Sequence, residues 1–143
     1  TAEDSKLAVE HGVDVVYVSN HGGRQLDHGR GSLDVLPECV DAVAGKAKVW
    51  VDGGFMRGTD VVKAMALGAD MVGLGRLQAL ALAAGGEDAL VRMLDILEHE
   101  VKIALMLSGV TGYDELGPEY VHKEYPAYPP HQFSAFPLLE DGY

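Results

Sequence analysis

Three side chains that could take part in chemistry stand close together directly after an apolar run of the chain. The run at residues 15–18 leads into the segment SNHGGRQLD, in which Asn20, His21 and Arg24 surround two glycines. An imidazole can accept a proton near neutral pH, and a guanidinium offers a planar fork that matches a carboxylate or a phosphate. We therefore interpret His21 and Arg24 as candidate catalytic residues, the alternatives being a structural histidine and a surface ion pair with Asp27.

Two more apolar runs end in residues that suit a ligand with hydroxyl and phosphate groups. The run at 48–51 is followed by Asp-Gly-Gly, and the run at 71–74 by Gly-Arg. An aspartate can accept hydrogen bonds from sugar-like hydroxyls, and glycine lets backbone N–H groups approach an anion closely. A tight turn is the alternative in each case, because a Gly-Gly pair alone is a weak signal. The candidate cofactor-binding residues are Asp52, Gly53, Gly54, Arg57, Gly75 and Arg76.

The sequence predicts helices and short strands that alternate along the chain. Thr1 and Asp4 form a capping pattern for a first helix, which Gly12 ends. Thr59 is expected to cap a later helix, and Gly109 to end a long one. The expected strands are 14–18, 48–51 and 71–74, and further expected helical segments are 35–43 and 90–108.

This alternation implies parallel βαβ units, in which the C-terminal ends of all strands lie at one edge of the sheet. The working groups of parallel α/β folds sit at that edge, so the candidate residues are expected to meet there. Three strands cannot close a barrel, and a separate three-stranded sheet would leave both of its edges open. We therefore expect the chain to form part of a larger (β/α) assembly.

Composition argues against several functional classes. The 143 residues carry a formal net charge of −11, which disfavours a general attraction to nucleic acid or to an anionic membrane. The single cysteine, Cys39, excludes an intrachain disulfide and favours a cytoplasmic location, with membrane association of a longer enzyme left open. The histidines have no metal-ligand spacing, so no metal site is expected. Glu98 and Glu100 are interpreted as part of a solvated helix face.

The last part of the chain has a different composition. Residues 111–143 hold five of the six prolines, so we expect little regular structure there and a tail that packs on other protein. The predicted division is therefore a domain over 1–110 and a tail over 111–143. The first residue is threonine rather than methionine, which suggests processing, truncation or a missing upstream segment.

The segments SNHGGRQLD and DGGFMRGTDVVKAMALGADMVGLGR together resemble the FMN-dependent α-hydroxy acid oxidase and dehydrogenase family, which includes glycolate oxidase, lactate oxidase and mandelate dehydrogenase. The resemblance runs from Thr1 to about Gly109. It implies that FMN is the cofactor and that the chain is the C-terminal half of a (β/α)₈ barrel, with strands six to eight and their helices. It also implies that His21 is the active-site base and that Arg24 grips the carboxylate of a 2-hydroxy acid.

The same resemblance assigns the other strand-end residues to the cofactor. One departure concerns the phosphate, because Met56 stands where the family usually has an arginine. Either Arg57 substitutes through a small backbone shift, or Arg76 and the backbone hold the phosphate alone. The residues that match the family segment around the ribityl chain and phosphate of FMN are Asp52, Gly53, Gly54, Gly75 and Arg76.

The first half of the family barrel has no counterpart in this sequence. We therefore expect an N-terminal half-barrel chain of the same enzyme as a partner, and a homo-oligomer for which a tetramer is one form. The expected reaction converts a 2-hydroxy acid to a 2-oxo acid, by hydride transfer or through a carbanion, and needs both halves. The alternatives are another phosphate-binding barrel enzyme, such as an IMP dehydrogenase-like protein or an FMN isomerase, and a non-catalytic half-barrel that binds a partner or a flavin.

Overall fold

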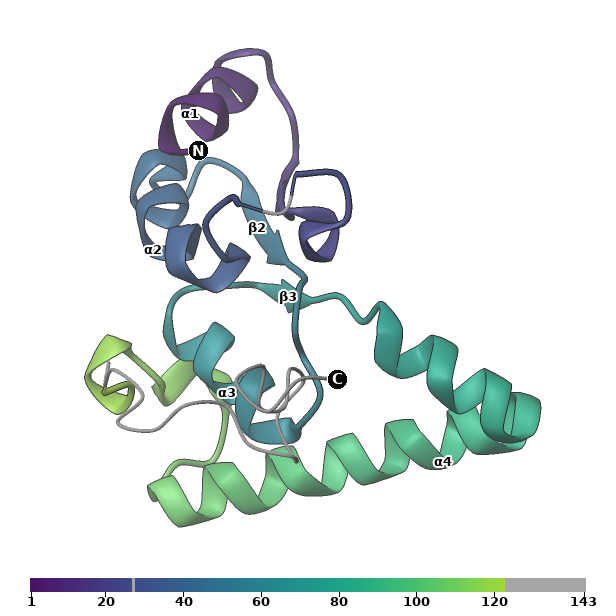
Figure 1. Ribbon diagram of the computed structural model, residues 1–143. Helices are drawn as coiled ribbons and strands as arrows, with labels where there is room; N and C mark the ends of the chain where they lie inside the picture. Colours follow the sequence, from purple (N-terminus) through teal and green to yellow (C-terminus); the bar gives the residue numbers. More distant parts are fainter. Residues whose placement is uncertain (27, 123–143) are drawn as a thin grey trace, which may run out of the picture.

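Three short parallel strands form the centre of the molecule, of which the computed structural model describes residues 1–26 and 28–122. In order across the sheet they are β1 (Val15–Val18), β2 (Lys48–Val51) and β3 (Met71–Val72) (Figure 1). The predicted parallel α/β arrangement is confirmed. β3 is shorter than the predicted strand, although the N–H of Gly73 still donates to the carbonyl of Val51 at 2.8 Å.

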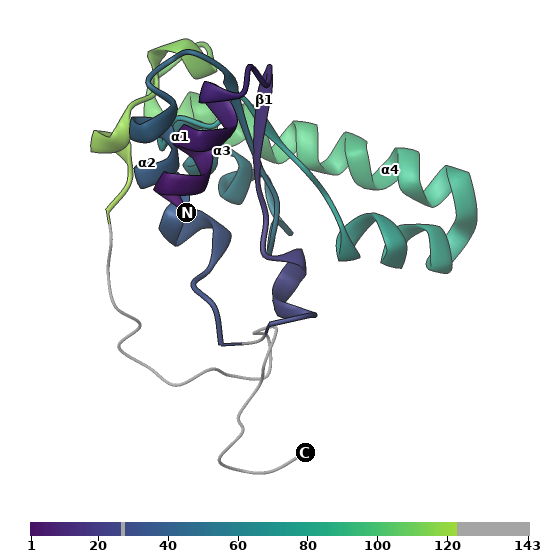
Figure 2. The same cartoon turned by 90° about the horizontal axis from the view of Figure 1, so that it is seen from above.

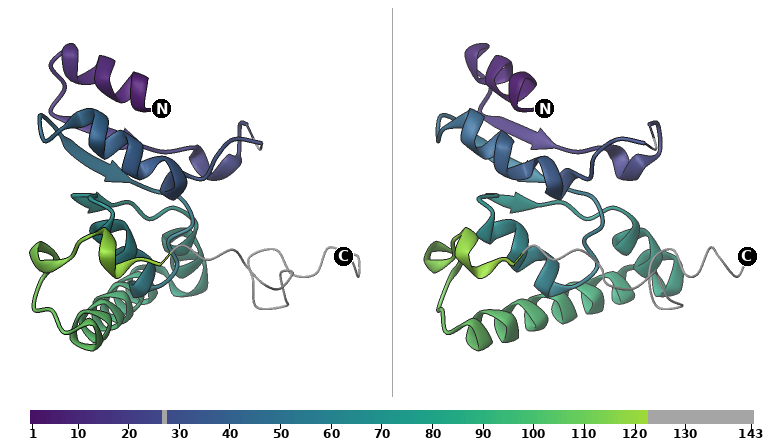
Figure 3. Two further views of the ribbon diagram at one scale, coloured as in Figure 1. Left: turned by 90° about the vertical axis from the view of Figure 1, so that its left-hand side faces the viewer. Right: turned by 60° about the vertical axis from the view of Figure 1, so that its left-hand side comes forward.

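Two helices cover one face of this sheet. α1 (Ala2–Glu10) and α2 (Ser32–Val43) pack against each other, and α2 also packs on β1 and β2 (Figure 3). Leu36, Cys39 and Val43 of α2 are almost fully buried, because the helix presents them to the sheet at helical spacing. The strand residues buried on this face are Val16, Val18, Val49 and Val51.

The opposite face of the sheet is uncovered within the described part of the chain. Tyr17, Trp50 and Met71 stand side by side across the three strands, because the register pairs Tyr17 with Trp50 and Trp50 with Met71. Tyr17 is 52% exposed and Met71 is 48% exposed. We call these three residues the open sheet face. Parallel sheets are normally covered on both sides, so this face is a surface on which more protein can pack.

The starts of the first two helices were predicted with different success. The capping box of α1 is confirmed, with the N–H of Asp4 donating to Thr1 Oγ1 at 3.2 Å. α2 begins at Ser32, three residues before the predicted start, so Pro37 lies in its second turn rather than its first.

The start of α3 (Gly58–Ala66) differs from the predicted cap at Thr59. The carboxylate of Asp60 accepts from the N–H groups of Met56 (3.1 Å) and Arg57 (3.0 Å). The prediction of a Thr59 cap is wrong, because the helix already starts at Gly58 and its N-cap residue is Arg57.

The chain after β3 forms α4 (Arg76–Ser108), which is a pair of helical arms joined at two glycines. Gly85 is extended and Gly86 has a φ of 63°, so the helix breaks there. The first arm leads away from the sheet and the second arm returns past α3 (Figures 1 and 2). The predicted segment 90–108 is confirmed as helix, and the cap at Gly109 is confirmed by its left-handed backbone.

The described part of the tail contains two single turns of 3₁₀-helix, η2 (Tyr113–Glu115) and η3 (Pro118–Tyr120), and both lie against α3. The remainder of the predicted tail, residues 123–143, lies outside the described residues. None of the helices in the described ranges combines the length and the apolar composition needed to cross a membrane.

Candidate functional site

The C-terminal ends of the three strands lie at one edge of the sheet, because the strands are parallel and in register. Residues 19–24 follow β1, residues 52–54 follow β2, and residues 73–76 follow β3. We call these three segments the strand-exit edge. All predicted site residues belong to it except Arg57, which lies at the start of α3.

The turn after β1 holds His21 in an unusual backbone conformation. All three residues of η1 (His21–Gly23) have a positive φ, which is 55° at His21. This conformation costs a residue with a Cβ about 1–2 kcal/mol, so the surroundings must hold it in place. The N–H of His21 donates to Ser19 Oγ (3.1 Å), and the N–H of Gly22 donates to Asn20 Oδ1 (2.9 Å). The imidazole is exposed at the edge of the sheet.

Two arginines flank the turn of η1. Arg24 ends η1 with a helical backbone and is exposed. Arg76 comes from the other side of the sheet, and its Nη2 would lie only 3.4 Å from a Cβ placed on Gly22. The Arg76 guanidinium therefore brings the segment after β3 close to the turn after β1.

Arg76 also begins α4, and the N-cap residue Gly75 gives this helix no side-chain cap. The first N–H groups of an α-helix have no partner within the helix, and they carry a partial positive charge. Together with the Arg76 guanidinium they form a place where a phosphate or a carboxylate can bind.

At the exit of β2, only one of the two carboxylate oxygens of Asp52 has a hydrogen-bond partner among the described residues. Asp52 Oδ2 accepts a hydrogen bond from the Tyr17 hydroxyl at 3.1 Å. Asp52 Oδ1 is buried and has no hydrogen-bond partner among the described residues. Burial raises the pKa of the Tyr17 phenol, and the charge and the hydrogen bond of Asp52 raise it further. A phenol with a raised pKa stays protonated near neutral pH, so Tyr17 remains a hydrogen-bond donor to Asp52.

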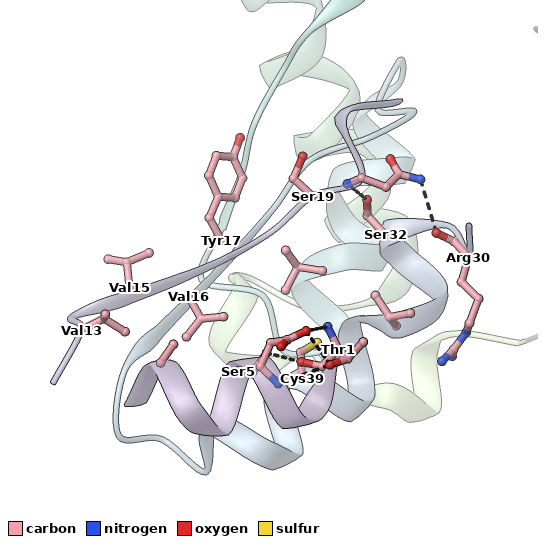
Figure 4. A pocket seen from close by; sticks show the side chains of 15 residues that line it. Thr1, Ser5, Val13, Val15, Val16, Tyr17, Ser19, Arg30, Ser32 and Cys39 are labelled. Carbon is pink, nitrogen blue, oxygen red and sulfur yellow. Dashed lines mark hydrogen bonds and ion pairs between the residues drawn. The ribbon is translucent and has the colours of Figure 1, made fainter. Parts of the chain in front are cut away.

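Gly53 brings the exits of β1 and β2 together. It has a φ of 108°, and a Cβ at this position would lie 3.1 Å from Ser32 Oγ. The Ser32 side chain is buried at the start of α2 and accepts from the N–H of Asn20 at 3.3 Å, while Asn20 Nδ2 donates to the Arg30 carbonyl (Figure 4). A side chain at position 53 would disturb this contact as well as strain the backbone.

Arg57 is bound to Glu100 of α4 rather than to a residue of the strand-exit edge. Its Nε lies 2.8 Å and its Nη2 2.7 Å from Glu100 Oε1, and Glu100 Oε2 accepts from the N–H of Gly58 at 2.7 Å. The hydrogen bond from Arg57 lowers the pKa of Glu100, and the Gly58 N–H lowers it further. The prediction that Glu100 belongs to a solvated helix face is wrong, because this carboxylate joins α4 to α3.

Sequence reasoning missed three residues that shape this region, namely Tyr17, Ser32 and Glu100. Tyr17 has a visible signal, since it is the one aromatic residue in a strand that otherwise consists of valines. Ser32 and Glu100 have none, because their partners are distant in the sequence and depend on the tertiary fold.

Two cavities in the described part of the chain lie beside the sheet, and each also reaches the strand-exit edge, one at Asn20 and the other at Leu74. One, of about 310 Å³, lies between α1, β1 and α2 and is lined by Val16, Val35 and Cys39 among others (Figure 4). The other, of about 280 Å³, lies between α3, β3 and α4 and includes Met71 and Leu97. They flank the outer edges of the sheet, at β1 and β3, which pair with no further strand in the part of the chain that the structure describes. No group of three or more metal-binding side chains occurs in residues 1–26 and 28–122.

Comparisons with known proteins agree on one family. The model of the FMN-dependent dehydrogenase family matches residues 1–123, and the chain belongs to this family. It is 48% identical over 124 residues to the peroxisomal (S)-2-hydroxyacid oxidase GLO3 of Arabidopsis thaliana, covering 87% of this chain and 34% of the relative. It is 44% identical over 120 residues to the L-lactate oxidase of Nostoc sp., covering 84% and 33%.

Solved structures of mandelate oxidase have the same fold over most of the chain. The complex with benzoyl-formic acid superimposes with a TM-score of 0.78 at 43% identity, over 82% of this chain and 37% of that chain. A mandelate oxidase variant with a monooxide FMN adduct gives a TM-score of 0.75 at 46% identity, over 77% and 35%. The chain thus spans about a third of the length of the relatives that it matches.

Proposed function

We propose that this chain supplies the C-terminal part of a (β/α)₈ barrel enzyme that oxidises a 2-hydroxy acid to a 2-oxo acid with FMN. The observation that carries the proposal is the strained turn that holds the exposed His21, with Arg24 at its end and the Arg76 guanidinium beside Gly22. Family membership supports FMN as the cofactor, and the names of the relatives support 2-hydroxy acids as the substrates.

The roles of His21 and Arg24 follow from their chemistry. Arg24 binds the substrate carboxylate through its planar fork and so fixes the substrate in one orientation. His21 then accepts one proton from the substrate, either from the hydroxyl group or from the α-carbon. When bound, FMN would supply the group that takes up the two electrons and the second proton of the oxidation.

The remaining strand-exit residues fit FMN in two places. Asp52 Oδ1, which is buried and has no partner among the described residues, suits a ribityl hydroxyl that can donate to it. The backbone at Gly53 and Gly54, with φ values of 108° and 83°, offers space that no side chain fills. The uncapped start of α4 at Gly75 and Arg76 suits the phosphate. Arg57 is engaged by Glu100, which favours Arg76 and the backbone over Arg57 as the phosphate ligands.

The rest of the barrel is the proposed partner of this chain. An N-terminal half-barrel would cover the open sheet face. It would also cover the outer edges of β1 and β3 and the cavities beside them. Residues 1–110 would then form the barrel half and residues 111–143 a tail on its outside. A homo-oligomer of the completed enzyme, such as a tetramer, belongs to the same proposal.

Anaerobic reduction of the flavin tests this function. The chain together with the first part of the barrel should bind FMN and should lose the visible flavin absorbance when a 2-hydroxy acid is added without oxygen. His21→Ala should bind FMN as before but should not bleach, because the base is missing. Bound flavin that no 2-hydroxy acid bleaches would support a different FMN enzyme or a binding module. Full turnover by His21→Ala would show that His21 is not the base.

A further inference from the structure

Tyr17 reaches from the middle of the sheet to the exit of the neighbouring strand. Its side chain stands on the side of β1 opposite to Val16 and Cys39 (Figure 4). Its ring meets Trp50 edge-on at 6.2 Å between centroids, and its hydroxyl donates to Asp52 Oδ2 at 3.1 Å. The contact crosses 35 residues of sequence and joins β1 to the residue that follows β2.

Position 73 leaves room for this contact only as glycine. A Cβ on Gly73 would collide with the Tyr17 hydroxyl and would lie 3.2 Å from Asp52 Cβ. The φ of Gly73 is not positive, so backbone conformation does not demand glycine here. The space taken by the phenol is the reason for a glycine at this place, and all three strands therefore contribute to the Tyr17–Asp52 pair.

In this pair, Asp52 Oδ2 accepts a hydrogen bond, whereas Oδ1 has no donor among the described residues. The Tyr17 hydroxyl has a single O–H, and it is used on Oδ2. Oδ1 is buried and has no partner among the described residues, an arrangement that is unfavourable when nothing compensates for it. A hydroxyl donor that arrives with a ligand would remove this cost.

We propose that Tyr17 is a positioning residue for the flavin, which holds the Asp52 carboxylate in the rotation that points Oδ1 at a ribityl hydroxyl. The proposal rests on the proposed function, because it takes FMN as the ligand. The raised pKa of the phenol agrees with it, since a protonated Tyr17 donates over the whole neutral range. Tyr17 itself touches neither substrate nor flavin in this arrangement.

The ribityl chain is shared by FMN and riboflavin, whereas only FMN has the phosphate, and this difference provides the test. Dissociation constants for both flavins are measured by flavin fluorescence on the chain assembled with the first part of the barrel. Tyr17→Phe keeps the ring against Trp50 and removes only the hydroxyl. It should weaken the binding of FMN and of riboflavin by the same factor, about three- to tenfold, the equivalent of one hydrogen bond. The matched control Arg76→Gln should weaken FMN and leave riboflavin nearly unchanged.

A double-mutant cycle separates positioning from a merely structural role. In the Asp52→Asn background, adding Tyr17→Phe should cost less than about twofold in flavin affinity, because the carboxylate that Tyr17 positions is already gone. A Tyr17→Phe cost that persists in full in this background would overturn the proposal. Unchanged affinity of the folded Tyr17→Phe protein for both flavins would overturn it too, as would a loss confined to FMN.

Gly73→Ala provides a second route if Tyr17→Phe does not fold. The added methyl group displaces the phenol from Asp52 while Tyr17 and Asp52 both stay in the sequence, and both flavins should again weaken equally. Unchanged affinity in a folded Gly73→Ala protein would contradict the proposal. A wild-type assembly that binds neither flavin would overturn the proposed function and this inference together, whereas wild-type binding with unaffected variants would overturn this inference alone.

Discussion

Arg24 and Arg76 differ from the two other arginines near the strand-exit edge. Arg30 is paired with Glu38 at 2.8 Å, and Arg57 with Glu100 at 2.7 Å. Within the described residues, the guanidinium groups of Arg24 and Arg76 make no hydrogen bond or ion pair. In a chain with 22 acidic residues, two unpaired guanidinium groups at one edge are available for anions that come from outside.

At the residue scale, Arg24→Lys tests whether the fork of Arg24 binds the substrate. An ammonium group keeps the charge but cannot make two parallel hydrogen bonds to a carboxylate. We expect the kcat/KM of the assembled enzyme for a 2-hydroxy acid to fall by about tenfold or more, mainly through a higher KM. The matched control Arg30→Lys should leave KM unchanged, because Arg30 already has a partner. Equal saturation curves for Arg24→Lys and the wild type would refute the assignment.

At the scale of elements, the contact between α3 and α4 depends on a glycine. A Cβ on Gly58 would lie 2.5 Å from Glu100 Cβ and 2.5 Å from the backbone N of Val101. Backbone atoms cannot move aside as a flexible side chain can, so Gly58→Ala should lower the free energy of unfolding by about 1–3 kcal/mol. Urea unfolding of the assembled protein measures this change. Thr59→Ala at the next position should cost about 0.5 kcal/mol or less, since Thr59 is not the cap of α3.

The Arg57–Glu100 pair makes the same contact dependent on pH. Because the pKa of Glu100 is lowered by the Arg57 hydrogen bond, the folded state favours the charged carboxylate. Its stabilisation is present in full above the ordinary value of 4.5 and is lost as the pH falls through the lowered value.

Glu100→Gln should therefore lower the urea midpoint at about pH 7, and its difference from the wild type should shrink as the pH falls below 4.5 through the lowered pKa of Glu100. Glu10→Gln is the control, because Glu10 is exposed and has no partner among the described residues. A difference between Glu100→Gln and the wild type that stays constant from neutral to acidic pH would contradict this role of the ion pair.

Local patterns in the sequence were enough for the elements and for most of the strand-exit edge. The valine-rich runs, the glycines after helices and the Thr1–Asp4 capping box depend on neighbours within a few residues. The partners of Glu100 lie more than 40 residues away, so no local pattern could indicate them. The Thr59 cap was wrong because α3 already begins at Gly58, where Asp60 in its first turn accepts from the N–H of the N-cap residue Arg57.

At the scale of the whole molecule, the candidate site residues lie along one edge of the sheet, the strand-exit edge. The open sheet face carries large apolar side chains of the kind that are normally buried in a protein interior. Val16 and Val51 are buried on the face that the helices cover. Tyr17 and Met71, which stand on the opposite face, are half exposed. Parallel strands are stable when both faces are covered. Under the proposed function, we therefore expect the strand-exit residues to form a complete site only when the open sheet face is covered as well.

Trp50 reports on this covering, since it is the only tryptophan of the chain and stands on the open sheet face between Tyr17 and Met71. Adding the first part of the barrel to this chain should shift the Trp50 emission to shorter wavelength, because the indole leaves water. Met71→Lys should weaken this association by about tenfold or more, since an unpaired ammonium group would be buried against the partner. Leu107→Lys introduces the same charge at a residue of α4 that is 84% exposed and outside the open sheet face, and it should associate like the wild type. Equal association of all three proteins would mean that the partner covers a different surface, and the half-barrel arrangement would then be wrong.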